Sequence, residues 1–179
     1  SIDLLGHGVQ NMSGPLSGIR ILDLSNVVSG PMAVQILADQ GADVIKVEQP
    51  GAGDTSRNMG ATRNGMGALF AILNRNKRSI VLDMQQDAAS KVMRELVKTS
   101  DVIVQNFRPG AMQRMGLDYP ALQEINESII YASISGFGQD GPYSKRRVYD
   151  PIIQGITGFV DTQTSRNDAN PQLIKNIVC

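Results

Sequence analysis

The segment Tyr131-Ala-Ser-Ile-Ser-Gly-Phe-Gly-Gln-Asp-Gly-Pro-Tyr143, followed by Arg147-Val-Tyr-Asp150, is the most informative stretch of the chain. A β-branched strand pattern leads into a glycine-rich loop and then into a carboxylate that opens an apolar helix. In open α/β sheets, ligands bind at the carboxyl ends of the strands, where this loop and this acid are expected. The segment therefore predicts an α/β fold with a binding site beside the loop and Asp150.

Strand patterns alternate with helix patterns on both sides of this segment. Short apolar runs predict five strands, at residues 19–24, 43–48, 79–83, 101–105 and 128–133. Helices are predicted between and after them, at residues 32–40 (opened by Gly30-Pro31), 66–73, 87–98, 111–115, 120–126 and 150–160, with loops at 49–63 and 161–171. Such alternation is typical of parallel βαβ units with strands buried on both faces.

Composition and charge exclude several classes of function. The 179 residues are 41% hydrophobic and carry 17 basic and 17 acidic side chains, so no bulk field favours nucleic acid or an anionic membrane. No apolar run is long enough for a transmembrane helix, and the first 13 residues lack signal-peptide features. The single cysteine, Cys179, excludes an intrachain disulfide and favours a reducing compartment, which predicts a cytoplasmic protein. With one histidine, His7, neither a histidine triad nor a multi-histidine metal site is expected.

Three clusters have both a functional and an ordinary structural interpretation. Asn106-Phe-Arg-Pro-Gly110 with Arg114 and Met115 combines an amide, a ring, a guanidinium and a thioether, which suits an adenine nucleotide. The alternative is a tight Pro-Gly turn with a packed phenylalanine. The basic run Arg75-Asn-Lys-Arg78 fits either phosphate contacts or a solvated loop, and Asp150 fits either a helix N-cap or an active-site acid.

The turn Ser25-Asn-Val-Val-Ser-Gly-Pro31 follows the first strand and opens a helix, where an anion is favoured. Its spacing alone favours an ordinary βα loop. It lacks the G-x-G-x-x-G fingerprint, so Glu48 has little support as the ribose-binding acid of a dinucleotide fold. A dinucleotide dehydrogenase is therefore the least favoured interpretation.

Seven segments in a fixed order resemble a known family. They are Pro15–Leu24, Gly30-Pro31, Leu37–Glu48 with Gly53-Asp54 and Arg57, Asn74–Ile80 with Leu82-Asp83, Asp101–Gly110, Ser133–Pro142 and Tyr149-Asp150. Together they are similar to the class III CoA-transferases of the formyl-CoA and carnitine type, which share their fold with α-methylacyl-CoA racemase. The resemblance implies a Rossmann-like large domain at residues 15–179 after an extension at 1–14, in a longer protein that forms an interlocked homodimer.

The resemblance also implies the ligands. Coenzyme A or an acyl-CoA is expected as a substrate, with a carboxylic acid as its partner and no permanently bound cofactor. Five positions match residues around the nucleotide: Leu82, Asn106, Phe107, Arg114 and Met115. Arg147 matches a basic residue near the CoA phosphates, and Arg75 is a further candidate because Gln49 and Gln85 replace basic residues of formyl-CoA transferase.

The implied active site is lined by Asp150 in a supporting role and by Gly136, Gly138 and Gln139 of the loop. The family's nucleophilic aspartate is expected just beyond Cys179, so this chain alone is expected to be inactive. Val28 replaces a glutamine of the formyl-CoA enzyme, which puts formate and oxalate specificity in doubt.

One position separates the two chemistries of this fold. Tyr149 occupies the place of the racemase histidine, and a tyrosine with a pKa near ~10 is a poor base at neutral pH, which favours transfer. An acyl-CoA racemase or isomerase, and a non-catalytic CoA-binding or nucleotide-binding module, remain as alternatives.

Overall fold

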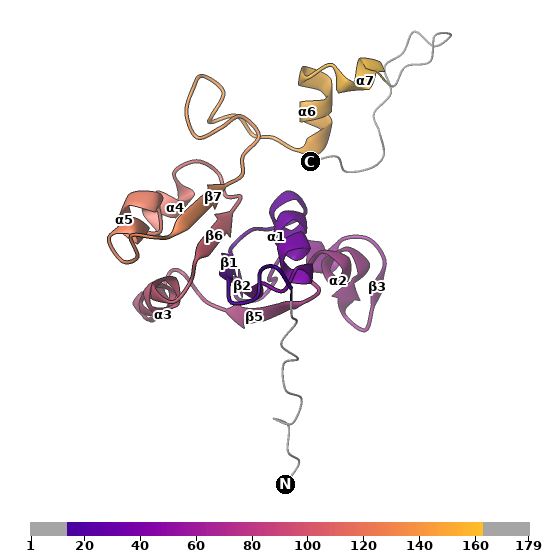
Figure 1. Cartoon of the computed structure of the whole chain (residues 1–179). Coiled ribbons are helices and arrows are strands. Elements are labelled where there is room, and N and C mark those ends of the chain that lie inside the picture. Colours follow the sequence, from indigo (N-terminus) through magenta and orange to yellow (C-terminus); the bar gives the residue numbers. More distant parts are fainter. Residues whose placement is uncertain (1–13, 163–179) are drawn as a thin grey trace.

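A five-stranded parallel sheet forms the centre of the molecule (Figure 1). The computed structural model describes residues 14–162. The strand order is β5-β2-β1-β6-β7. The strands are β1 (Arg20–Asp23), β2 (Asp43–Glu48), β5 (Lys77–Val81), β6 (Val102–Gln105) and β7 (Ile130–Ser133). The predicted α/β fold with a parallel sheet is confirmed.

Helices cover both faces of the sheet (Figure 1). On one face lies α1 (Ser29–Asp39), beside α2 (Ala68–Leu73). On the other face lie α3 (Asp87–Lys98), α4 (Ala111–Arg114) and α5 (Tyr119–Gln123). Two clusters of buried apolar side chains fill the spaces between helices and sheet. The smaller one lies under α1, and the larger one, here called the α3–α5 core, lies under the other three helices.

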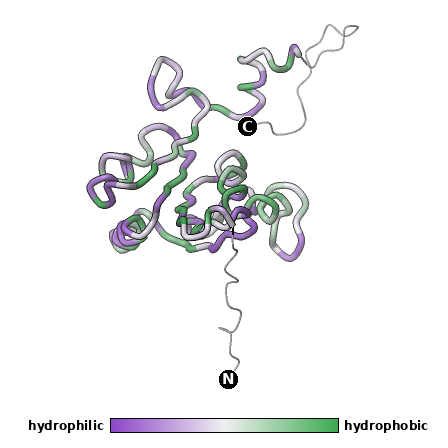
Figure 2. The backbone as a smooth tube through the Cα atoms, in the orientation of Figure 1, coloured by the Kyte–Doolittle hydropathy of each residue, from purple (hydrophilic) through white to green (hydrophobic). Residues whose placement is uncertain are grey.

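Helix α3 illustrates how the sequence pattern fixes an element. Its buried residues Ala89, Met93 and Val97 recur every fourth position, which puts them on one face of a helix. Figure 2 shows hydrophobic and hydrophilic residues alternating along its tube. The predicted range of this helix, residues 87–98, is confirmed.

The strand order creates a switch point between β1 and β6. From β1 the chain adds β2 and β5 on one side, and then returns to add β6 and β7 on the other. The loops that leave the carboxyl ends of β1 and β6 therefore diverge to opposite faces. In doubly wound sheets this crevice is the place where ligands bind.

The predicted loop at residues 49–63 contains structure that the sequence analysis missed. A 3₁₀ helix, η1 (Thr55–Asn58), is followed by the antiparallel pair β3 (Thr62–Arg63) and β4 (Met66–Gly67). Between these strands, Asn64 and Gly65 both have positive φ, as an Asn-Gly hairpin turn requires. The helix predicted from Met66 therefore begins only at Ala68.

Several other predicted boundaries differ: β7 begins at Ile130 instead of Ser128, and α5 covers residues 119–123 instead of 120–126. Two further differences have a clear physical reason. Strand β5 covers residues 77–81 instead of 79–83, because this edge strand begins with Lys77 and Arg78, which an apolar pattern does not detect. The final helix is interrupted at Gly158, where φ is 74°, and so gives α6 (Asp150–Ile156) and α7 (Phe159–Thr162). The predicted loop from Asp161 thus starts inside a helix, and its remainder lies outside the described residues.

No helix among residues 14–162 has the length and apolar character needed to cross a membrane. The predicted extension at residues 1–14 lies almost entirely outside the described part of the chain.

Candidate functional site

Two asparagines join the loops at the switch point. The Asn26 N–H donates to Asn106 Oδ1 at 2.8 Å, and Asn106 Nδ2 donates to the Asn26 carbonyl oxygen at 2.8 Å. Asn26 follows β1 and Asn106 follows β6, so the reciprocal pair bridges the crevice. It holds the loop 24–28 and the segment 106–110 together as one wall of the candidate site.

Most of the predicted nucleotide-binding residues lie at this carboxyl edge. Leu82 directly follows β5, and Phe107 follows β6. Together with Met115 after α4, they are partly buried and pack against the α3–α5 core. Arg114 is the last residue of α4 and is exposed. The structure thus places the Phe107 ring next to the half-buried Asn106, with the Arg114 guanidinium near Gly110 of the same segment.

The glycine-rich loop is tied to β6 and β7 through one hydroxyl. Ser133 Oγ accepts from Gln139 Nε2 at 2.7 Å and from Gln105 Nε2 at 2.6 Å. Gln105 Oε1 in turn accepts the Phe107 N–H at 2.7 Å. This chain of hydrogen bonds connects the predicted loop residue Gln139 with the predicted nucleotide-binding residue Phe107.

Close packing also shapes this loop. A Cβ added at Gly136 would lie 2.4 Å from Val148 Cγ1, which leaves no room for a side chain there. Gly138 has a φ of 81°, which other residues rarely adopt. The loop therefore folds back on the segment that carries Arg147, an exposed residue.

Asp150 is the first residue of α6, and the N-cap is Tyr149, so the N-cap interpretation of Asp150 is wrong. Gln154 Nε2 donates to Asp150 Oδ2 at 2.5 Å from the next turn of the helix. Figure 1 shows α6 and α7 away from the sheet. The helix that begins with Asp150 thus lies apart from the sheet that carries β6.

Arg75 lies at the opposite edge of the sheet. It precedes β5 and forms an ion pair at 2.5 Å with Asp39, the last residue of α1. Arg75 and Asp39 thus both lie at the amino ends of the strands. The hydrogen bond from Arg75 is the main reason why the pKa of Asp39 is below its ordinary value. The assignment of Arg75 to a CoA phosphate stays a prediction, and this placement separates it from the other candidates.

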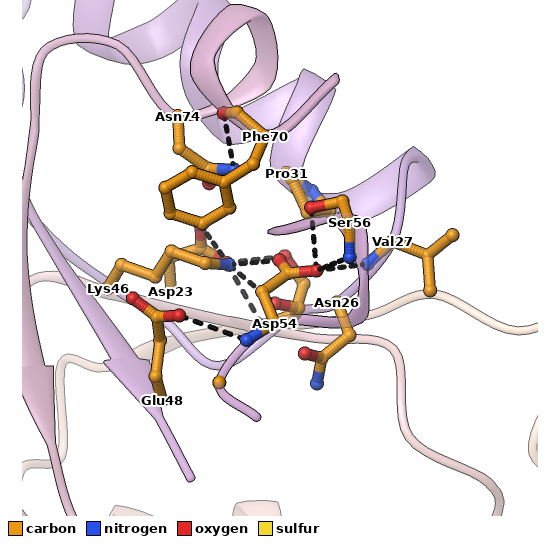
Figure 3. Close-up of polar contacts among 12 residues, drawn as sticks. Asp23, Asn26, Val27, Pro31, Lys46, Glu48, Asp54, Ser56, Phe70 and Asn74 are labelled. Atoms are coloured by element: carbon orange, nitrogen blue, oxygen red, sulfur yellow. Dashed lines mark hydrogen bonds and ion pairs between the residues drawn. The ribbon is translucent and has the colours of Figure 1, made fainter. Parts of the chain in front are cut away.

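Sequence analysis missed a cluster of buried charges at the carboxyl edge (Figure 3). Lys46 Nζ lies 2.8 Å from Asp54 Oδ2 and 3.8 Å from Asp23 Oδ2. Lys77 Nζ lies 2.8 Å from Asp23 Oδ2 and also donates to the Pro31 carbonyl oxygen. All four side chains are at most 1% exposed. Two ammonium groups and two carboxylates thus balance one another beneath the loop 24–28.

For Lys77 and Asp54, burial and the neighbouring charges shift the pKa in opposite directions. Burial lowers the pKa of Lys77, although Asp23 partly counters it. Burial alone would raise the pKa of Asp54, but hydrogen bonding and charge from Lys46 with hydrogen bonds from Ser56 bring that pKa below its ordinary value. Asp54 is therefore a carboxylate at neutral pH.

Glu48 is held by a separate set of partners. Arg57 Nε and Nη2 donate to its two oxygens at 2.7 Å each, and Ser79 Oγ and the Asp54 N–H add two more bonds. Burial opposes ionisation, but these donors outweigh it and lower the pKa of Glu48 to about 2. A carboxylate with four internal donors is structural, which agrees with the weak support for a ribose-binding role.

One sequence signal points to the buried cluster of Asp23, Lys46, Asp54 and Lys77. Asp23 ends the apolar run of β1 and Lys46 interrupts that of β2, and charged residues are almost never fully buried unless paired. Their partners Asp54 and Lys77 come from other segments, so the pairing itself needs the fold. Among residues 14–162, no group of three His, Cys, Asp or Glu side chains is arranged to hold a metal ion.

Comparison with known proteins gives a consistent result. The family model described as CoA-transferase family III matches residues 16–179. A succinate–glutarate CoA-transferase of Agrobacterium fabrum is 44% identical over 168 residues, which is 90% of this chain and 42% of that protein. A formyl-CoA:oxalate CoA-transferase of Rhodopseudomonas palustris is 46% identical over 161 residues, which is 89% of this chain and 37% of that protein.

A crystal structure of a CaiB/BaiF family protein from Brucella suis superimposes with a TM-score of 0.86 and 41% identity. The match covers 92% of this chain and 44% of that one. The chain thus spans about two-fifths of the length of the proteins that it matches.

Proposed function

The chain belongs to CoA-transferase family III, and from this premise we propose that the full-length protein transfers CoA from an acyl-CoA donor to a carboxylic acid. The observation that carries the proposal is the wall at the β1–β6 switch point, where Phe107 follows the Asn26–Asn106 pair and packs against the α3–α5 core. Met115, and Leu82 at the end of β5, border the same core. Flat apolar surface next to polar groups suits an adenine ring, and the exposed Arg114 suits a phosphate.

The proposed reaction is covalent and proceeds in balanced steps. An enzyme carboxylate attacks the thioester carbonyl, and the C–S bond breaks to give a mixed anhydride and CoA thiolate. The thiolate attacks the enzyme's acyl carbon and releases the donor acid, which leaves an enzyme thioester. The acceptor carboxylate then attacks the enzyme thioester and releases CoA thiolate, which gives a second mixed anhydride. The thiolate attacks the acyl carbon of the acceptor, which releases the new acyl-CoA and regenerates the enzyme carboxylate. One difficult exchange is thereby divided into easier ones.

We propose that none of the described residues is the attacking aspartate, which the resemblance implies only as an expectation beyond Cys179. In the proposal Asp150 orients reacting groups, Arg147 neutralises CoA phosphates, and the loop with Gly136, Gly138 and Gln139 covers the reacting atoms. An interlocked homodimer belongs to the same proposal.

Small dicarboxylic acids are the acceptors that we propose to test first. The relatives that match most of this chain are named for succinate, glutarate and oxalate as acids. Val28, which is 8% exposed at the switch point, replaces a glutamine of the formyl-CoA enzyme. An apolar side chain there favours a longer acid with methylene groups over oxalate, because it provides no hydrogen bond to a second carboxylate.

The test incubates the full-length protein with succinyl-CoA and either glutarate, oxalate or no acceptor, and follows CoA thioesters by mass spectrometry. The proposal predicts glutaryl-CoA and free succinate in equal amounts, with less product from oxalate. Hydroxylamine should trap an enzyme acyl group without an acceptor. Exchange of the donor's α-proton in deuterated water without any transfer would instead support a racemase or isomerase.

A further inference from the structure

Val27 adopts a conformation that its side chain disfavours. Its φ is 68°, in the left-handed region, where a β-branched residue is a genuine outlier. The other non-glycine residues with positive φ among residues 14–162 are Asn64 and Asn76, a residue type that tolerates this region. Such strain persists only where the surrounding structure enforces it, and it occurs preferentially at functional sites.

Three side chains from distant parts of the sequence bond to the loop at successive residues, and Figure 3 shows two of them, Lys46 and Asp54. Lys46 Nζ donates to the Ser25 carbonyl oxygen at 2.8 Å. Asn106 holds both backbone groups of Asn26 at 2.8 Å. The Val27 N–H donates to Asp54 Oδ1 at 3.1 Å. Lys46 lies in β2, Asn106 follows β6 and Asp54 precedes η1, so the conformation of the loop is enforced by residues outside it.

Asp54 is the centre of this arrangement. Its Oδ1 accepts from the Val27 N–H and, at 2.8 Å each, from the Ser56 N–H and hydroxyl, while its Oδ2 pairs with Lys46. The residue is fully buried. Stability alone does not explain such a group, because replacing buried ion pairs by well-packed apolar residues is often neutral or stabilising.

We propose that Asp54 is a positioning residue for the reaction: it holds Val27 in the left-handed conformation and so keeps the loop 24–28 fixed against Asn106 at the switch point. The effect on turnover rests on the proposed function. The structural claim, that Asp54 immobilises this loop, is independent of the proposed function. Asp54 acts through the loop backbone and is not expected to touch the substrate.

The kinetic test is a double-mutant cycle in the full-length protein, using succinyl-CoA and glutarate. Asp54→Asn removes the negative charge that Lys46 and the loop share, and we expect kcat/KM to fall on the order of 10- to 100-fold, as small misplacements in active sites do. Val27→Gly adopts positive φ without strain, so Asp54→Asn should cost clearly less in that background. Val27→Pro fixes φ near −65° and should lower kcat/KM more than Val27→Gly does.

The control is Asp43→Asn, a carboxylate paired with Arg20 and Arg78 at the opposite edge of the sheet. This substitution should leave kcat/KM unchanged. Equal losses from Asp54→Asn in the native and Val27→Gly backgrounds, or equal activities of the Val27→Gly and Val27→Pro variants, would overturn the positioning role. The comparison of the two Val27 variants keeps the test decisive if Asp54→Asn does not fold.

Hydrogen exchange separates the two claims. In the full-length protein, Asp54→Asn should accelerate amide exchange in the peptide 24–31 at least tenfold relative to Asp43→Asn. The asparagine amide has one acceptor oxygen, which cannot serve both Lys46 on one side and the Val27 N–H on the other. Faster exchange in Asp54→Asn, in a protein without transferase activity, would refute the proposed function and support the claim that Asp54 immobilises the loop 24–28. Unchanged exchange in an active protein would refute only the claim that Asp54 immobilises this loop.

Discussion

Lys46 is the residue on which the buried charge cluster depends most. Its ammonium lies between Asp23 and Asp54 and also donates to the loop, all without access to water. Lys77 balances only Asp23 directly, at 2.8 Å. Removing Lys46 therefore leaves the Asp54 carboxylate buried without its cation.

We predict that Lys46→Met lowers the free energy of unfolding by about 3–5 kcal/mol, the cost of breaking a buried ion pair from one side. Urea unfolding of the full-length protein measures it. Lys98→Met is the matched control, since Lys98 pairs with Glu95 in solvent and should matter by less than about 1 kcal/mol. Equal effects of the two substitutions would show that the cluster contributes little.

Glu48 should make stability depend on acid pH. Arg57, Ser79 and the Asp54 N–H lower its pKa from an ordinary value near 4.5 to about 2. A group with a depressed pKa stabilises the fold above its unfolded pKa, and this stabilisation is lost as pH falls towards the folded pKa. The shift corresponds to roughly 3 kcal/mol, at 1.36 kcal/mol for each unit.

As the pH is lowered from ~5 to ~2, the midpoint of urea unfolding should therefore decrease by more in the native protein than in Glu48→Gln. Glu95→Gln, at an exposed position, provides the control and should behave like the native protein. A Glu48→Gln variant that retains the full slope would assign the acid sensitivity to other carboxylates.

At the scale of elements, the glycine-rich loop depends on its contact with the segment before α6. A Cβ at Gly136 would lie 2.4 Å from Val148 Cγ1 and 2.8 Å from its Cβ. We predict that Gly136→Ala costs about 1–3 kcal/mol of local stability through overpacking and reduces transferase activity. Steady-state kinetics and hydrogen exchange over residues 134–149 measure the two effects.

Adding Val148→Gly to Gly136→Ala removes the colliding atoms and should restore part of the activity. Gly155→Ala is the matched control, because nothing lies within 4 Å of a Cβ at that position and alanine favours a helix. Full activity of the single Gly136→Ala variant would mean that this contact is not needed for turnover.

The elements that the sequence predicted well are those in which one pattern dominates. Helix α3 has a single apolar stripe, and β2 is a buried run of matching bounds. The β3–β4 hairpin was missed because its strands have two residues each, although Asn64-Gly65 indicated the turn. The start of β5 was missed because Lys77 is buried by charge pairing instead of by apolar packing.

At the scale of the whole molecule, the candidate site could be predicted only in part. Residues that directly follow strands, such as Leu82 and Asn106, lie where the fold rule places them. Arg75 precedes its strand, and its distance from the others follows from topology. The hydrogen bond from the Val27 N–H to Asp54 joins two segments that no local sequence pattern connects.

The two edges of the sheet therefore give a paired prediction. In the full-length protein, Arg114→Ala should raise the KM for acyl-CoA about tenfold, as expected for the loss of roughly 1.4 kcal/mol of phosphate binding. Arg75→Ala, at the amino edge, should leave that KM unchanged. Kinetics at varied acyl-CoA concentration compare them, and a larger effect from Arg75 would place the phosphates at the other edge.

The central claim is that the carboxyl edge at the β1–β6 switch point holds CoA. A crystal structure of the full-length protein with CoA tests it most directly. We predict the adenine ring beside Phe107 and Met115, the phosphates near Arg114 or Arg147, and an unchanged left-handed Val27 in the loop beside them. CoA bound at the amino edge near Arg75, or away from the segment 106–115, would contradict the account.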